Sequence, residues 1–459
     1  MKARTALRLA RPASAADRAR CVLVACSTVV AGALLLAAMH VLRMPADSGA
    51  GLARYVTESG LRPGVVIATL LLTVPVLALT DQALRVGSVA RDRRLASLRL
   101  AGATPRDVRV IAALEAGGAA IAGGLLGGPV YLFVWLLAGA LSPAGARMLH
   151  APDAVDLLAW AVLLPLAGLA GAFAGAAVHG RAVVEPLGVR RRSRPPAPGR
   201  ASLAVLMSGA ALVVAVMVAV PLVEDHGDRL GLLILAMIGL LLAAFAGGPR
   251  LVLACARVLG RRRGAEALLA SRHLRADPRS AGRVAGVLLV CGIALGFEGF
   301  LIADQTFSGG FGSGDDAAFF LTGYAMAALV VLTAAAVALV TLLVGAADGL
   351  LDARRPLSTL AALGAGEGVL VRVLARQLTA TAVPAVVAGA LVGGAPAGAL
   401  LGVASDGGHA LDAAARALGP AAVAAVVAGL VLAAAARLAA RLLRPMIRAA
   451  IDPENLRAA

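Results

Sequence analysis

The chain has 459 residues, of which 60% are hydrophobic and only 15% are charged. Soluble globular domains are usually about 45 to 50% apolar and about 25% charged, so this composition excludes an ordinary soluble protein and indicates an integral membrane protein. The net charge of +17 does not indicate a nucleic-acid-binding protein, because the arginines lie between apolar runs and no nucleic-acid-binding motif accompanies them.

The N-terminal segment is basic, with Lys2 and five arginines against a single acidic residue, Asp17. Because positively charged segments remain on the cytoplasmic side of a membrane, we expect a cytoplasmic N-terminus. The first apolar run continues to about residue 42 and is long enough to span the membrane. A short outer loop near 44 to 61 separates it from a second span that ends near residue 80. The arginine-rich segment 85 to 109 is then cytoplasmic.

Two more spans, at about 112 to 141 and 155 to 177, complete the first half of the chain. The linker 190 to 199 is rich in arginine and proline, which indicates an extended cytoplasmic connection. A central hairpin follows, with spans at about 202 to 222 and 230 to 256 and an acidic outer turn between them.

The second half has the same order of elements as the first. We expect span seven at about 283 to 303, a short outer loop that contains aspartates, and span eight to about residue 346. A second surface segment and spans nine and ten follow, and the arginines after span ten predict a cytoplasmic C-terminus. The sequence therefore predicts an all-α integral membrane protein with about ten transmembrane helices and both termini in the cytoplasm.

One stretch of the sequence occurs twice, because residues 91 to 129 have a partial copy about 262 positions later. Each copy has two leucines three residues apart, which share one face of a helix, and then a break at Gly-Ala. After the break a new helix begins. Thr104, Pro105 and Asp107 predict a capped start in the first copy, and Gly366 with Glu367 predicts a weaker one in the second. A short surface helix therefore precedes a membrane helix twice.

The two halves of the chain also end in similar motifs, since Glu185-Pro186 and Asp452-Pro453 are each followed by an apolar residue and an arginine. Because an even number of spans separates equivalent points, the halves have the same orientation and form a parallel repeat of four-helix modules. The expected domains are a first module at 1–180, a linker and two-helix hairpin at 181–265, a second module at 266–445 and a cytoplasmic tail at 446–459.

The sequence offers no candidate enzyme site. Lys2 is the only lysine, which excludes a phosphate-binding loop of the G-x-x-x-x-G-K-[ST] type, and neither H-E-x-x-H nor G-x-S-x-G occurs. The four cysteines lack metal-ligand spacing, so we expect no catalytic residue, cofactor or metal in this chain. Glu298 in span seven is a possible intramembrane polar site, with a water-exposed position near the interface as the alternative. For Glu115 and its approximate equivalent Gln377, helix packing is favoured over substrate contact.

The two copies resemble the FtsX-like permease domain of MacB-type ABC transporters in their arginines, their L-x-x-L-x-x-x-G-A spacing and the long helix that follows, which in the first copy contains Glu115 and Gly-Gly. The resemblance covers residues 1–190 and 268–457. It implies that residues of about 83–105 and 347–366 are coupling helices that dock on a separate ATPase dimer, which would hold ATP and Mg²⁺. The docking residues that it implies are Arg93, Arg94, Leu95, Leu98, Arg355, Leu357 and Leu360.

This resemblance implies a permease subunit in a bacterial plasma membrane, where it couples ATP hydrolysis by the partner to export of a substrate. Two alternatives remain, a non-transporting transmembrane actuator driven by an ATPase and an ion-driven secondary transporter. The outer loops are shorter than in many relatives of this family, so we expect no extracytoplasmic partner. The arginine-rich segments could instead serve only as topology anchors that hold anionic headgroups, and membrane lipids are expected partners in either case.

Overall fold

The computed structural model describes residues 5, 8–10, 12, 15–45, 53–58, 61–85, 94, 97–141, 149–180, 199–219, 222–223, 226–307, 315–404 and 410–452. Every regular element in these residues is helical, and ten of the helices are long and apolar enough to cross a membrane. The chain is therefore an all-helical, multi-pass membrane protein, as its composition predicts. It divides into two compact units, Met1–Arg191 and Arg192–Ala459.

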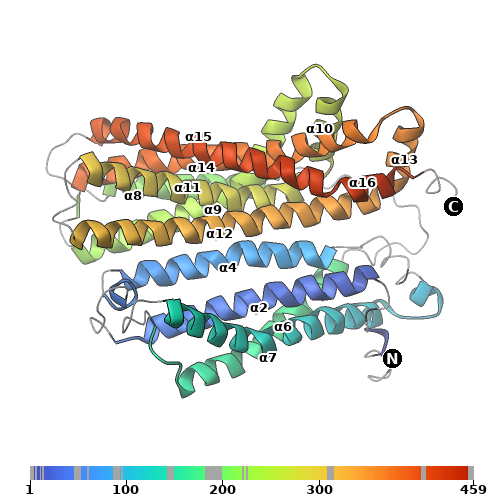
Figure 1. The fold of residues 1–459 in the computed structure, drawn as a ribbon, viewed down its shortest axis with the longest axis horizontal. Coiled ribbons are helices and arrows are strands. Elements are labelled where there is room, and N and C mark those ends of the chain that lie inside the picture. Colours follow the sequence, from blue (N-terminus) through green and yellow to red (C-terminus); the bar gives the residue numbers. More distant parts are fainter. Residues whose placement is uncertain are drawn as a thin grey trace. The chain divides into compact units, whose positions relative to one another are not determined.

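The described part of the first unit contains four membrane-length helices (Figure 1), which are α2 (Ala15–Arg43), α4 (Arg62–Arg85), α6 (Pro105–Leu141) and α7 (Ala154–Gly180). Helix α2 packs against both α4 and α6, and α6 packs against α7. The one-turn helix α3 (Arg54–Thr57) lies in the connection between α2 and α4. Helix α6 begins before the expected start of span three, because its polar first turns continue without a break into the apolar part.

The described part of the second unit contains six membrane-length helices, which are α8 (Arg200–Ala219), α9 (His226–Arg261), α11 (Pro278–Phe307), α12 (Asp315–Asp352), α14 (Glu367–Ala404) and α15 (Ala410–Leu442). Helix α11 contacts α9, α12, α14 and α15 and so forms the centre of this unit. Helices α8 and α9 pack on each other as a hairpin, and α9 also packs on α11. Three shorter helices complete the unit, α10 (Ala265–Ala276), α13 (Arg354–Ala362) and α16 (Arg444–Ala450).

The membrane helices of the two units make contacts in the same order. In the first unit, α2 contacts α4 and α6, and α6 contacts α7. In the second unit, α11 contacts α12 and α14, and α14 contacts α15. The hairpin of α8 and α9 has no counterpart in the described helices of the first unit.

Helices α11 and α14 cross with their backbones in direct contact, because glycines line the crossing on both sides. Gly292 and Gly296 lie on α11, and Gly389 and Gly393 lie on α14. A Cβ atom at any of these four positions would overlap a backbone carbonyl oxygen of the other helix. The spacing of four residues in each helix is that of the small-residue motif that allows membrane helices to approach closely. Close backbone packing therefore takes the place of a bulky core here.

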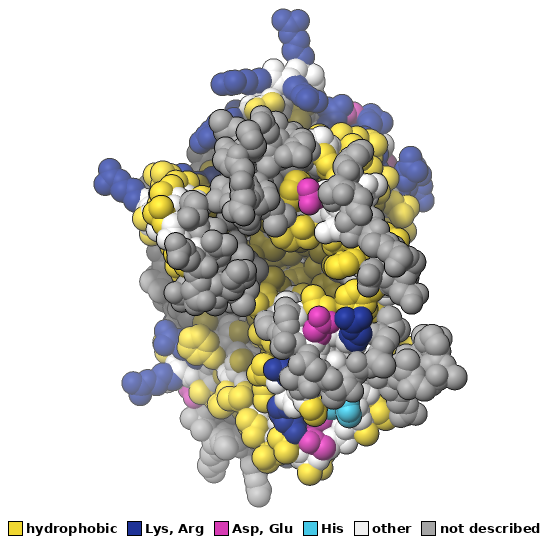
Figure 2. Space-filling view, turned by 90° about the vertical axis from the view of Figure 1, so that its left-hand side faces the viewer, with side chains coloured by type: hydrophobic (Ala, Val, Ile, Leu, Met, Phe, Trp, Pro, Cys, Tyr) yellow, Lys and Arg dark blue, Asp and Glu magenta, His cyan; other side chains and the backbone are white. Residues whose placement is uncertain are grey.

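Large hydrophobic side chains cover the outer faces of the spans. On α7, Leu166, Leu169 and Phe173 are 52%, 67% and 77% exposed, and on α15 Val423 and Leu430 are 65% and 66% exposed. Figure 2 looks along the helices from the left-hand end of Figure 1, and there too hydrophobic side chains predominate over the described surface, with charged side chains among them. Such continuous apolar surface is unfavourable in water but suits contact with lipid.

Candidate functional site

The two repeated segments, the first comprising the described residues 94 and 97–104 and the second residues 353–366, end their short helices in the same way. Gly102 and Gly364 both have a φ of 94°. In each segment the glycine amide donates to the carbonyl three residues earlier at 2.9 Å. The next amide donates at 3.0 Å to the carbonyl five residues earlier, which belongs to Leu98 or Leu360. This pair of bonds is the Schellman motif, and its left-handed residue explains the glycine in both copies.

The membrane helix α6 starts with the reciprocal cap that the sequence predicts. The hydroxyl oxygen of Thr104 accepts a hydrogen bond from the amide of Asp107 at 3.3 Å, and the carboxylate of Asp107 accepts one from the amide of Thr104 at 3.0 Å. Pro105 is the first residue of the helix, where its missing N–H costs nothing. The left-handed turn and this cap hold the first repeated segment at a defined angle to α6.

At the second repeated segment an ion pair holds the start of the membrane helix. Glu367, the first residue of α14, binds Arg444 and Arg448 of α16, with 2.7 Å between its carboxylate and Nε of Arg448. Helix α16 also contacts α12, α13 and α14. Glu367 therefore does more than face the positive end of the helix dipole, because it also joins α14 to α16 beside the second repeated segment.

The structure describes five of the seven residues that the family resemblance implies for docking, and Arg93 and Leu95 lie outside the described residues. Arg94 is engaged within the protein, since its guanidinium donates to the carbonyl of Leu9 at 2.6 Å and lies 3.6 Å from the carboxylate of Asp17. The other four described residues differ in exposure. Arg355 is exposed, and the three leucines Leu98, Leu357 and Leu360 are half-buried.

The most exposed leucines of the repeated segments are two that the sequence analysis did not select. Leu100 is 89% exposed and Leu363 is 80% exposed. Leu363 directly precedes its left-handed glycine and Leu100 lies two positions before its own, whereas Leu98 and Leu360 occupy the position whose carbonyl accepts the bond from the amide five residues later. Helical spacing alone cannot identify Leu100 and Leu363, because the turn changes the direction of the chain at this point. Both side chains are therefore accessible on the described surface of their segments.

A buried ionic network lies behind the first repeated segment. Arg20 of α2 binds Glu115 of α6 and also lies 3.1 Å from Asp17, and the side chains of Arg20 and Glu115 are 3% and 4% exposed. Asp17 in turn faces Arg94. Charges so deeply buried are tolerated only when they are paired, so the network holds the segment, α2 and α6 together. Glu115 thus has the helix-packing role that the sequence favours, but its partner Arg20 was not predicted.

A second polar cluster lies at the opposite end of α2, where this helix meets α7. His40 Nδ1 lies 2.7 Å from the carboxylate of Asp156, and Arg43 binds Asp156 at 3.0 Å and Asp153 at 2.5 Å. The hydrogen bond from Arg43 lowers the pKa of Asp153 to about 2. Tyr131 of α6 lies beside His40, with 6.3 Å between ring centroids. The sequence does not predict this cluster, since no short motif connects these residues.

Glu298, the candidate intramembrane acid, lies on α11 and is 8% exposed. One of its carboxylate oxygens is buried and has no hydrogen-bond partner among the described residues. Burying a carboxylate in this way is costly, so the position is a candidate for a functional acid in the second unit.

The described residues contain no group of three or more His, Cys, Asp or Glu side chains that could hold a metal ion. Comparisons of this chain with models of protein families, with curated proteins and with solved structures find no match. The residues and their geometry are therefore the basis for a functional proposal.

Proposed function

We propose that this chain is the membrane permease subunit of an ABC-type transporter, with two FtsX-like modules and a separate ATPase dimer that binds ATP and Mg²⁺. The modules correspond to α2, α4, α6 and α7 and to α11, α12, α14 and α15, joined by the hairpin of α8 and α9. In this proposal both termini lie in the cytoplasm of a bacterium, and ATP hydrolysis drives export of a substrate across or out of the plasma membrane.

The observation that carries this proposal is the pair of matching helix ends at Gly102 and Gly364. Each one precedes a membrane helix that packs closely on other spans of its unit. These helices are α6, which packs mainly on α2 and α7, and α14, which packs mainly on α11 and α15. A force applied to either repeated segment would therefore act directly on a span that packs closely against other spans of its four-helix group. Two equivalent segments suit a partner with two equivalent surfaces, which is what a symmetric dimer provides.

Two further features support an external source of energy and a modular build. Lys2 is the only lysine of the chain, so a nucleotide-binding loop with the usual lysine has to belong to another protein. The shared order of contacts within the two groups of four helices is what a duplicated module would produce. The buried network around Arg20 and the ion pairs of Glu367 would then transmit movement from the repeated segments to the spans.

Co-purification with the ATPase encoded beside this chain tests the proposal. We expect Leu100→Glu and Leu363→Glu each to weaken ATPase binding by at least about 30-fold, because a charge replaces an apolar contact at the centre of an interface. Stimulation of ATP hydrolysis by the membrane subunit should fall in parallel. Leu222→Glu is the matched control. Leu222 is 78% exposed, but it follows the C-terminal end of α8, which the proposed topology places on the outer side of the membrane.

Two outcomes would count against the docking role. One is unchanged ATPase binding by both Leu100→Glu and Leu363→Glu in folded protein. The other is an equal loss in Leu222→Glu, which would show that added charge anywhere disrupts the complex. If docking holds but reconstituted vesicles transport no substrate of any class, the chain would be a non-transporting actuator driven by the ATPase.

One observation favours a second function, that of an ion-driven secondary transporter. The buried carboxylate of Glu298 in α11 could bind a proton within the membrane. This function predicts uptake or efflux in ATP-depleted vesicles under a proton gradient, with loss of transport in Glu298→Gln. Transport that requires the ATPase and survives Glu298→Gln would exclude it.

A further inference from the structure

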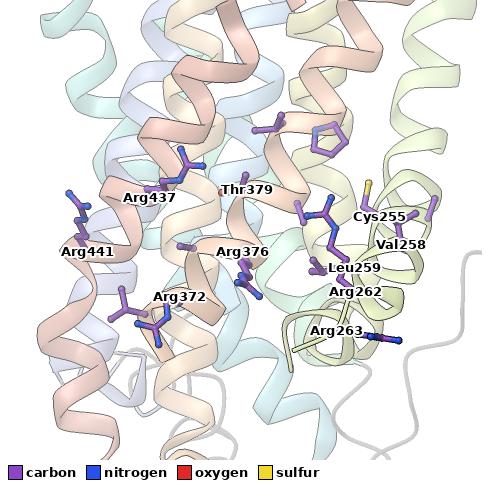
Figure 3. A pocket seen from close by; sticks show the side chains of 16 residues that line it. Cys255, Val258, Leu259, Arg262, Arg263, Arg372, Arg376, Thr379, Arg437 and Arg441 are labelled. Atoms are coloured by element: carbon purple, nitrogen blue, oxygen red, sulfur yellow. The ribbon is translucent and has the colours of Figure 1, made fainter. Parts of the chain in front are cut away.

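A cavity of about 830 Å³ opens between α9, α14 and α15 in the second unit, and it carries an unusual concentration of positive charge. Six arginines line it, with two from each side in Figure 3 and two on α14 between them. They are Arg262 and Arg263, Arg437 and Arg441, and Arg372 and Arg376. Neither the repeated segments nor the ionic networks described above account for this group.

Only part of this charge is balanced within the protein. Glu266 of α10 binds Arg372 at 2.6 Å and Arg376 at 3.0 Å, and the hydrogen bond from Arg372 lowers the pKa of Glu266. No carboxylate of the described residues pairs with the other four arginines. Guanidinium groups that face one cavity repel each other, so an anion between them would be strongly favoured. Arginine also offers paired N–H donors that match the oxygens of a phosphate group.

The rest of the cavity wall is mainly apolar and lies further along α9 and α14, beyond the arginines. It includes Val258 and Cys255 on α9 and Val383 and Pro384 on α14. From Val371 to Pro384 the cavity follows α14 for about 20 Å, at 1.5 Å for each residue. Half of a bilayer's hydrocarbon core measures about 15 Å, so the cavity is as long as one leaflet together with its headgroup region.

The arginines lie where a headgroup would be. Arg262 and Arg263 directly follow the end of α9, Arg441 is the last residue but one of α15, and Arg372 is in the second turn of α14. Cationic groups at the helix ends and an apolar wall toward the helix centres are complementary to the anionic phosphate and the apolar acyl chains of a phospholipid. We propose that this cavity binds one anionic glycerophospholipid, with its phosphate among the arginines and its acyl chains along α9 and α14.

The first unit provides an internal comparison. A smaller cavity of about 490 Å³ lies on α6 and is lined by Leu114, Glu115 and Gly118, with Arg8 as its one arginine. The repeat spacing of about 262 residues aligns Leu114 with Arg376 and Val110 with Arg372, so these two cavity arginines have apolar counterparts on α6. The cationic cavity is therefore a property of the second unit. It does not depend on the proposed ATPase partner.

Native mass spectrometry of the full chain with defined lipids tests the proposal. We expect one tightly retained phosphatidylglycerol in preference to phosphatidylcholine. Arg437→Gln/Arg441→Gln should weaken this retention by at least about tenfold, since hydrogen bonds to charged groups are lost without leaving a carboxylate unpaired. Arg106→Gln/Arg109→Gln removes the same charge from exposed positions on α6 and should leave retention unchanged.

A second measurement identifies the site even if the variant is unstable. Phosphatidylglycerol with a photoreactive acyl chain should label peptides of α9 and α14 around Val258 and Val383 in the unmodified protein. Glycerol phosphate has the headgroup chemistry but no acyl chain. It should prevent this labelling at least about tenfold less well than unlabelled phosphatidylglycerol does, because the apolar wall contributes to binding. Equal competition would indicate a site for a soluble phosphate and overturn the proposal. Labelling elsewhere, equal loss in the Arg106→Gln/Arg109→Gln control, or no headgroup preference would also overturn it.

Discussion

The buried network around Arg20 predicts an order of effects that a surface ion pair would not give. Arg20 contacts two carboxylates, those of Asp17 and Glu115, while Glu115 contacts Arg20 across the boundary of α2 and α6. Replacing Arg20 by Met removes the guanidinium from both acids at a site that is 3% exposed. Breaking a buried pair in this way costs about 3 to 5 kcal/mol.

Glu115→Gln should cost less stability than Arg20→Met, because the new amide oxygen still accepts a hydrogen bond from Arg20. Arg20 also retains its ion pair with Asp17 at 3.1 Å. We expect a loss of about 1 to 3 kcal/mol for Glu115→Gln. In a folding unit of about 150 to 250 residues, the loss in Arg20→Met corresponds to a melting temperature lower by about 6 to 20 °C. The double variant Arg20→Met/Glu115→Leu should recover part of this loss, since two apolar side chains then face each other while Asp17 remains without Arg20.

Thermal unfolding of the purified protein in one detergent measures all three variants. The exposed pair of Arg54 and Glu58, 3.5 Å apart with side chains 51% and 40% exposed, is the matched control. Arg54→Met should cost no more than about 1 kcal/mol. A melting temperature for Arg20→Met that equals that of Arg54→Met, or no recovery in the double variant, would refute a buried network between α2 and α6.

Three further changes test other features of the structure. Gly296→Ala should destabilise the protein by about 1 to 3 kcal/mol, because its methyl group would overlap α14, whereas Gly118→Ala, which meets open space, should be neutral or stabilising in the same unfolding assay. Gly364→Ala forces a φ of 94° on alanine and should speed amide exchange in α13 by about fivefold, and unchanged exchange would contradict the left-handed turn. Asp153→Asn keeps the side-chain oxygen that accepts hydrogen bonds from the amides of Val155 and Asp156 at the start of α7, but removes the charge. Because the pKa of Asp153 is lowered to about 2, the wild type should be the more stable above about pH 4 and lose this advantage as the pH falls toward 2, and a constant difference would contradict the pairing with Arg43.

The features that the sequence predicts correctly depend on short stretches of chain. The ten spans follow from the length of apolar runs, and the cap formed by Thr104 and Asp107 depends on residues three positions apart. The break at Gly102 and Gly364 is equally local, because a left-handed residue at a helix end requires only glycine and its neighbours.

The contacts that the sequence does not predict join residues that are far apart in the chain. Arg20 and Glu115 are 95 residues apart, and His40 and Asp156 are 116 residues apart. The cationic cavity likewise combines arginines from three helices. In the linear sequence these arginines are indistinguishable from those that only orient the spans, because membrane orientation depends on their number near a span and not on their partners.

The glycine crossing of α11 and α14 limits how the second unit can change shape. Side chains usually separate the backbones of two packed helices, and here the backbones touch each other directly. Neither helix can slide along the other without driving a carbonyl oxygen into a neighbouring Cα atom. A displacement that begins at Glu367 is thus shared by the two helices as one rigid body. It also reaches α9, because a Cβ atom at Gly248 of that helix would overlap the backbone carbonyl oxygen of Gly282 on α11.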